Sequence, residues 1–105
     1  MINQQKNKLY ILVSDQLETV YGSVQGGHVV AQWLLEHPNQ NWNNQYLIYL
    51  SCNIDYYKEM LTFYNEDFSS FYEPDLNNRL TAIAILETNL NKKFFKKLKL
   101  LGDQN

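Results

Sequence analysis

The chain has 105 residues and a formal net charge of −2, with 45% hydrophobic and 19% charged residues. That length can bury one core without metals or disulfides, and the composition excludes a disordered tail. No apolar run approaches a membrane span, and the N-terminal residues are too polar for a signal peptide. We therefore expect a single cytoplasmic domain over residues 1–105, with no membrane partner, and the lone Cys52 fits a reducing compartment.

The first strand and helix are predicted from two contrasting patterns. Residues 8–14 form a near-continuous apolar and β-branched run, which is typical of a strand buried on both faces. A helix is expected over residues 23–37, ended by Pro38, with Gln25 on its more polar side. Its apolar stripe is predicted from residues that recur on one helical face, namely Val24, His28, Ala31 and Leu35.

A second strand and helix are expected in the middle of the chain. Residues 45–51 repeat the pattern of a buried strand. Asn53 or Asp55 can cap a helix that runs to about Glu66, because both side chains accept backbone hydrogen bonds. The side chains expected to point inward are Tyr56, Met60, Leu61 and Tyr64.

The last third is predicted to form two strands and a helix. Residues 68–72 are a short aromatic strand, and Pro74 confines the following segment to a turn. Residues 80–86 are the most hydrophobic run, which indicates the central strand, with small alanines that leave room for close packing. A basic amphipathic helix is expected over about 90–101, its apolar face formed by Phe94, Phe95, Leu98 and Leu101.

The predicted order is β-α-β-α-β-β-α. Strands that alternate with helices indicate an α/β fold with a parallel or mixed sheet covered on both faces. We therefore expect one three-layer domain, in which a four-stranded mixed sheet is flanked by helices and the core spans residues 8–86.

One histidine and its neighbouring glycines are candidates for chemistry. His28 can position a carbonyl group or move a proton, or it can be a buried histidine whose ring nitrogens bond to the backbone. Gly22, Gly26 and Gly27 can open the helix start to a ligand, or they can permit close helix packing. The residues alone leave both choices open.

Three segments together resemble the peptidyl-tRNA hydrolase 2 superfamily. They are the helix segment from Gln25 to His28, the turn Glu73-Pro74-Asp75-Leu76 and the segment Thr81-Ala82-Ile83-Ala84 of the late strand. Members of this superfamily are about this length, form a mixed four-stranded sheet between helices, and are often homodimers. They cleave the ester between peptide and tRNA. The resemblance implies tRNA and a second copy of the chain as partners.

The resemblance also implies roles for individual residues. The family's catalytic lysine falls on Tyr21, and its later aspartate and threonine fall on Ser69 and Glu73. By resemblance, the catalytic residues are Gln25, His28, Glu73 and Asp75, and the substrate contacts are Tyr21, Gly26, Gly27 and Thr81.

The distribution of charge restricts where a nucleic acid can bind. Up to residue 91 there are four basic residues against ten acidic ones, so the field of the main body opposes phosphate. The C-terminal lysine run can contact a phosphate backbone or can be a solvated helix face. Its candidate contacts are Lys92, Lys93, Lys96 and Lys97. No metal-ligand spacing is present, and neither a metal nor another cofactor is expected.

Three functions remain open from the sequence. The first is an ester hydrolase acting on peptidyl-tRNA or N-blocked aminoacyl-tRNA, in which a positioned water attacks the ester carbonyl. The second is a module of the same fold that binds tRNA or a protein without catalysis. The third is a small dimeric interaction protein whose tyrosine- and tryptophan-rich surface makes the contacts.

Overall fold

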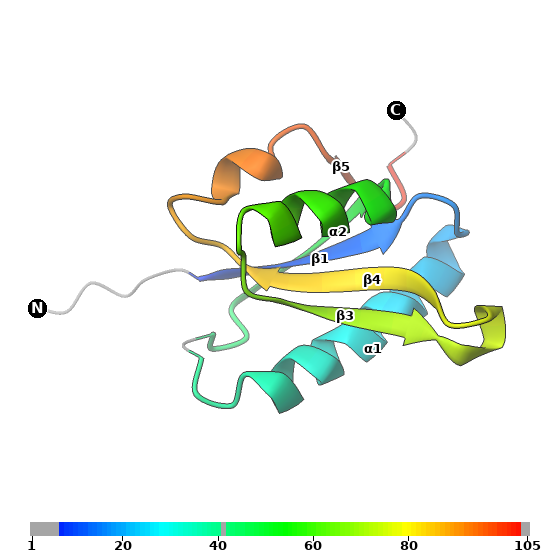
Figure 1. Ribbon diagram of the computed structural model, residues 1–105, viewed down its shortest axis with the longest axis horizontal. Coiled ribbons are helices and arrows are strands. Elements are labelled where there is room, and N and C mark those ends of the chain that lie inside the picture. The colour runs from blue at the N-terminus through cyan, green and yellow to red at the C-terminus, as the bar shows by residue number, and fades with distance from the viewer. Residues whose placement is uncertain (1–6, 41, 104–105) are drawn as a thin grey trace, which may run out of the picture.

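The computed structural model describes residues 7–40 and 42–103 (Figure 1). In that part of the chain no helix is long and apolar enough to cross a membrane. In chain order, its elements are β1 (Lys8–Ser14), α1 (Thr19–Glu36), β2 (Tyr46–Cys52), α2 (Ile54–Phe63), β3 (Phe68–Glu73), the 3₁₀ turn η1 (Pro74–Leu76), β4 (Arg79–Leu86), the 3₁₀ turn η2 (Lys92–Phe94) and β5 (Lys99–Leu100).

The strands form one mixed sheet of five, in the order β3-β4-β1-β2-β5. β1 and β2 are parallel, in register from Lys8 opposite Tyr46 to Ser14 opposite Cys52. β4 is antiparallel to both β1 and β3, and β5 is antiparallel to β2. β1, β2 and β3 therefore run in the same direction and end at one edge of the sheet, which we call the carboxyl edge.

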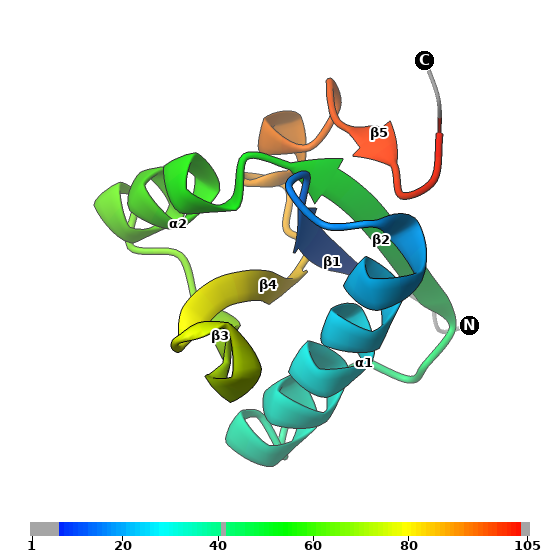
Figure 2. The same ribbon diagram turned by 90° about the vertical axis from the view of Figure 1, so that its right-hand side faces the viewer.

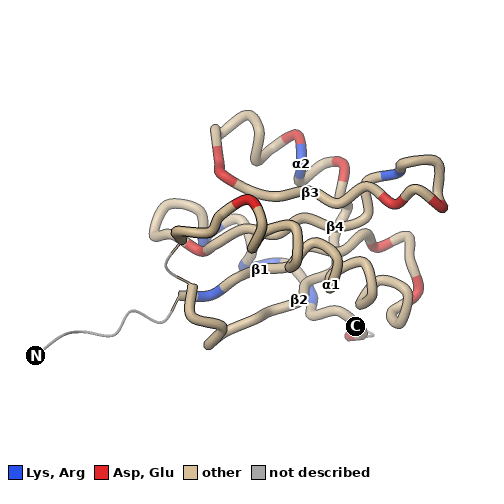
Figure 3. The backbone as a smooth tube through the Cα atoms, turned by 90° about the horizontal axis from the view of Figure 1, so that it is seen from below, with Lys and Arg blue, Asp and Glu red and all other residues tan. Residues whose placement is uncertain are grey.

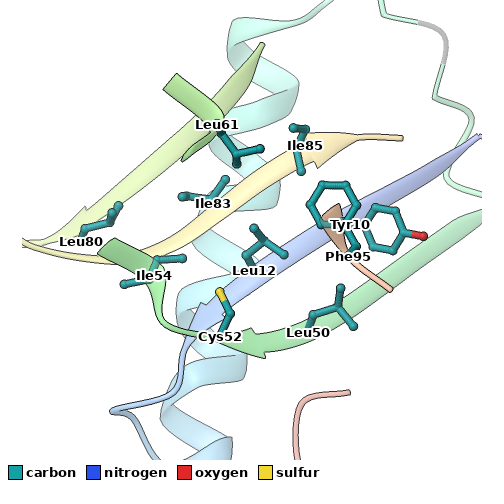
Figure 4. Close-up of a cluster of buried hydrophobic side chains, with 10 residues drawn as sticks. All are labelled: Tyr10, Leu12, Leu50, Cys52, Ile54, Leu61, Leu80, Ile83, Ile85 and Phe95. Atoms are coloured by element: carbon teal, nitrogen blue, oxygen red, sulfur yellow. The ribbon is translucent and has the colours of Figure 1, made fainter. Parts of the chain in front are cut away.

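The two helices cover opposite faces of this sheet (Figure 2). Successive strand residues point to opposite faces, so β1 supplies both layers. Leu9, Ile11 and Val13 pack with Val29 and Trp33 of α1. On the other face, beneath α2, a second cluster stands on the sheet (Figure 4), made up of Tyr10, Leu12, Leu50, Cys52, Ile54, Leu61, Leu80, Ile83, Ile85 and Phe95. The predicted three-layer α/β arrangement is confirmed.

Two glycines bring α1 very close to the sheet. A Cβ atom at Gly26 would lie 2.3 Å from Cε2 of Tyr49, and one at Gly22 would lie 2.8 Å from Cγ1 of Val13. Both distances are shorter than side chains tolerate, so these positions accept only glycine without a shift of their neighbours. A Cβ atom at Gly27 would meet nothing within 4 Å. Gly22 and Gly26 therefore serve helix–sheet packing.

The predicted apolar stripe of α1 was wrong. Val24 and Leu35 are 52% and 78% exposed, and His28 and Ala31 also face solvent. The helix begins at Thr19, earlier than expected, and its buried residues are Gly22, Gln25, Gly26, Val29 and Trp33. The spacing of apolar side chains does not predict this buried face, because close backbone approach and a hydrogen-bonded glutamine replace ordinary apolar packing along it.

The second helix, α2, is shorter than predicted and buries a different face. Of the two predicted caps it is Asn53 whose side chain accepts a hydrogen bond from the backbone N–H of Tyr56, and the helix ends at Phe63 rather than near Glu66. Its buried residues are Ile54 and Leu61, whereas Tyr56 and Tyr64, which were expected inside, are 58% and 53% exposed.

The predicted helix over about 90–101 is absent from this described segment. The segment forms η2 and then β5, and the backbone N–H of Leu101 donates to the carbonyl of Tyr49. β2 would otherwise end the sheet with unpaired backbone groups, so pairing with β5 takes precedence over a helical periodicity. As a result the sheet has five strands, not four, and β1, not β4, lies at its centre.

The contrast between Gly26 and Gly27 gives a direct test of α1 packing. We expect Gly26→Ala to lower the free energy of unfolding by about 1–3 kcal/mol, because its methyl group collides with the ring of Tyr49. Gly27→Ala should raise it by up to about 1 kcal/mol, since open space surrounds that position and alanine favours helix. Urea unfolding of the two variants measures both changes, and equal effects would contradict this packing.

Candidate functional site

The candidate site begins with a glutamine buried between α1 and the carboxyl edge. Gln25 is 0% exposed. Its Nε2 donates to Oε1 of Glu73 at 2.8 Å, and its Oε1 accepts from the hydroxyl of Thr81 at 2.6 Å. One amide thus joins α1 to the end of β3 and the start of β4. Because a buried amide is costly to leave unpaired, these contacts fix the register of helix against sheet.

Glu73 is held as a carboxylate at the end of β3. Its second oxygen accepts from the backbone N–H of Asp75 at 3.1 Å, across the turn formed by Pro74. The hydrogen bond from Gln25, the bond from Asp75 and the nearby His28 lower the pKa of Glu73 below its usual value. Each of these contacts favours the charged form, so Glu73 supplies a fixed negative charge near neutral pH.

β3 contacts α1 through a series of side chains along its length. Ser69 Oγ donates to Oε1 of Glu36 at 2.5 Å near the helix end, and Glu73 accepts from Gln25 near the helix start. Between them, the His28 ring stacks on Phe71, with centroids 4.6 Å apart and planes 7° apart. His28 is exposed, so the alternative of a buried histidine satisfied by the backbone was wrong.

Tyr21 lies beside the same acidic turn. Partial desolvation, followed by the charges of Glu73 and Asp75, raises the pKa of its phenol. Tyr21, Val24 and His28 recur on the outward side of α1, so they form one surface next to Glu73. Figure 3 shows acidic positions both in the loop before α1 and in the turn after β3. Acidic side chains therefore predominate around the site, although Arg79 pairs with Glu73 across β3 and β4.

An open groove of about 610 Å³ adjoins this surface. Leu17, Val20, Tyr21, Val24, Leu76 and Arg79 contribute to its walls, together with Gln16 and Glu18. No pattern in the sequence indicates this groove, because Val24 is expected in the apolar stripe of α1 and the strand that begins at Arg79 is recognised only by its apolar residues. The groove offers apolar surface with a guanidinium at its margin.

Most of the residues implied by the resemblance meet at this place. They are Tyr21, Gln25, His28, Glu73, Asp75 and Thr81. Gly26 faces Tyr49 in the core, and Gly27 lies on the open side of α1. The lysine candidates Lys92, Lys93, Lys96 and Lys97 lie in or just after η2, on the segment that leads to β5 at the other side of the sheet.

A second constellation has the residue types of a hydrolase triad but not its geometry. His37 Nε2 lies 2.9 Å from Oδ1 of Asp67, and Ser69 Oγ lies 3.5 Å from His37 Nδ1. However, Ser69 is 1% exposed and its hydroxyl already donates to Glu36. A nucleophile needs an accessible oxygen whose proton passes to the histidine. These side chains instead tie the end of α1 to β3.

Cys52 is not an available nucleophile. Burial, with a smaller effect from Asp15, raises the pKa of its thiol to about 12, so the thiol stays neutral. Among the described residues, no three side chains of the histidine, cysteine, aspartate or glutamate type gather in a way that could hold a metal ion.

Comparison with known proteins supports the fold but assigns no activity. No protein-family model matches the chain, and no curated protein matches it either. Among solved structures, the chain is similar to the protein of unknown function Atu0240 from Agrobacterium tumefaciens strain C58. The TM-score is 0.68 at 10% sequence identity, over 92% of this chain and 98% of that one. At this identity the similarity concerns the arrangement of helices and strands alone.

The buried amide gives the first prediction for the site. We expect Gln25→Ala to lower the free energy of unfolding by about 2–4 kcal/mol, because it removes the buried hydrogen bonds to Oε1 of Glu73 and to the hydroxyl of Thr81 and opens a cavity. Gln32→Ala is the matched control on the same helix, since Gln32 makes only an exposed hydrogen bond to Glu36, and it should cost about 0.5 kcal/mol or less. Chemical denaturation of both variants measures the difference.

The carboxylate of Glu73 predicts how the stability of the fold changes at acidic pH. Its folded pKa lies below the usual 4.5, so the unfolded chain binds the proton more readily. Its contribution is present above about pH 4.5 and is lost as the pH falls through the folded value. Melting temperatures between about pH 5 and about pH 3 should therefore fall less steeply for Glu73→Gln than for the wild type. Parallel curves would contradict this role. A residual slope is expected from Glu36, whose pKa is also lowered by hydrogen bonds from Ser69 and Gln32.

Proposed function

We propose that the protein is an ester hydrolase of the peptidyl-tRNA hydrolase 2 type, acting on peptidyl-tRNA or N-blocked aminoacyl-tRNA. The single observation that carries this proposal is the placement of His28. Its exposed imidazole stacks on Phe71 beside a carboxylate, Glu73, which is held by Gln25. An accessible imidazole held beside a carboxylate is suited to general base catalysis, because it can accept a proton from water and later return it.

The chemistry needs one water molecule and this histidine. His28 accepts a proton from the water as its oxygen attacks the ester carbonyl carbon. The tetrahedral intermediate then collapses, breaking the bond between that carbon and the ribose oxygen. The imidazolium returns its proton to the leaving oxygen, so that a carboxylic acid and the free ribose hydroxyl of tRNA result. No covalent intermediate on the protein is required.

The other residues of the site act through position rather than through contact with the ester. Gln25 and Thr81 are both 0% exposed and bond to protein groups, so they are positioning residues that hold Glu73. Tyr21 and Val24 line the adjoining groove on the same side of α1 as His28. That apolar surface is suited to a side chain of the peptide or to the terminal base of the RNA.

A second candidate is a module of this fold that binds without catalysis. One feature favours it: Tyr21 stands where the family's lysine is expected, and Glu73 and Asp75 make its surroundings negative. A site without that cation stabilises a developing oxyanion poorly. The same residues would then hold the RNA end or a protein segment without cleaving an ester.

Release of the N-blocked amino acid from N-acetyl-aminoacyl-tRNA tests the proposal. The wild type should exceed the spontaneous loss of the ester, and His28→Ala should lower the rate by about a hundredfold or more. His37→Gln is the matched control, since this second histidine contacts Trp33 and Asp67 at the far end of α1, and it should keep the rate. A wild-type rate equal to the background contradicts the hydrolase. Retained tRNA binding in that case supports the non-catalytic module.

A further inference from the structure

A second cavity lies at the carboxyl edge, where β1 and β2 end side by side. It measures about 530 Å³, a size that takes a small-molecule ligand. Asp15 follows β1 and Asn53 follows β2, and both line it, together with Ser51 and Cys52 at the strand end. The segment around β5 closes its other side. This cavity is distinct from the surface formed by His28 and Glu73.

The topology of the sheet leaves a crevice at this position. β1 and β2 are parallel neighbours, but the segments that follow them pass to opposite faces of the sheet. β1 continues into α1 on one face, and β2 continues into α2 on the other. In open α/β sheets the two diverging connections leave a crevice outside the strand ends, and ligands bind in such crevices. The cavity lies at that point.

Two lysines give the cavity a chemical preference. Lys97 and Lys99 both line it, and in the described part of the chain neither forms an ion pair. Thr19 and Ser51 add hydroxyl groups to the wall. Thr19 is also the first residue of α1, so the cavity adjoins a helix start that has no side-chain cap and carries a partial positive charge. Unpaired ammonium groups with hydroxyl donors are suited to a phosphate group.

We propose that this cavity binds the phosphate group of a nucleotide. Its volume exceeds what a bare phosphate ion needs, which leaves space for the sugar and base. Two carboxylates, Asp15 and Asp103, line the cavity as well and offset part of the lysine charge. Binding therefore rests on the placement of Lys97 and Lys99 rather than on a net positive field, and it weakens as salt is added. It is also independent of the proposed hydrolysis, because no residue of that mechanism lines the cavity.

Isothermal titration calorimetry of the full chain with three probes tests whether the phosphate group is what the cavity binds. Adenosine 5′-monophosphate should bind saturably, inorganic phosphate more weakly, and adenosine weakest of all. A short single-stranded RNA carried in parallel distinguishes a free nucleotide from an RNA strand as the source of the phosphate. Adenosine binding as tightly as its monophosphate would overturn the proposal, and so would the absence of saturable binding by every phosphate-bearing probe.

Matched lysine variants locate the site. Lys97→Gln and Lys99→Gln should each weaken binding of the monophosphate by about tenfold. Lys92→Gln and Lys93→Gln remove the same charge from the same segment but outside the cavity, and they should change the affinity by about twofold or less. Asp103→Asn should tighten binding, since it removes an opposing charge. Equal losses from all four lysine variants would show a diffuse charge effect and overturn the assigned site. The His28→Ala variant should bind the monophosphate as tightly as the wild type does. Nucleotide binding can therefore be confirmed even if the wild type shows no hydrolysis.

Discussion

The buried amide of Gln25 is the contact on which the arrangement of the carboxyl edge depends. A polar group at 0% exposure must find partners within the protein, and this one finds Glu73 on β3 and Thr81 on β4. These bonds allow little rotation of α1 about its own axis. The outward side of the helix, with Tyr21 and His28, is therefore always presented next to the turn after β3.

Close packing and hydrogen bonding act together along α1. Gly22 and Gly26 let the helix backbone approach β1 and β2, while Gln25 between them reaches the sheet through its amide. At the far end, the side chains of Glu36 and His37 contact Ser69 and Asp67. The helix is thus fixed at both ends against β3, which is an edge strand, and the catalytic proposal relies on that rigidity.

The carboxyl edge carries two chemically different surfaces. The one beside Glu73 combines carboxylates and apolar side chains with an exposed imidazole, and it is the surface at which we propose ester hydrolysis. The cavity at the ends of β1 and β2 carries Lys97 and Lys99 and is suited to a phosphate. Leu17, in the loop between β1 and α1, lines both the groove next to the first surface and the cavity. The two surfaces are therefore neighbours at the carboxyl edge, although neither proposal depends on the other.

The sequence by itself determined four of the five strands, because long apolar β-branched runs such as residues 8–14 and 80–86 have few other ways to be buried. It narrowed the α2 cap to Asn53 or Asp55, and the resemblance pointed to several of the residues that meet around Glu73. Only the tertiary structure decided which side of α1 is buried, since Gln25 is polar until Glu73 and Thr81 satisfy it. Tertiary pairing also turned the expected C-terminal helix into β5, because the open side of β2 supplied backbone partners that no local pattern of phenylalanines and lysines could reveal.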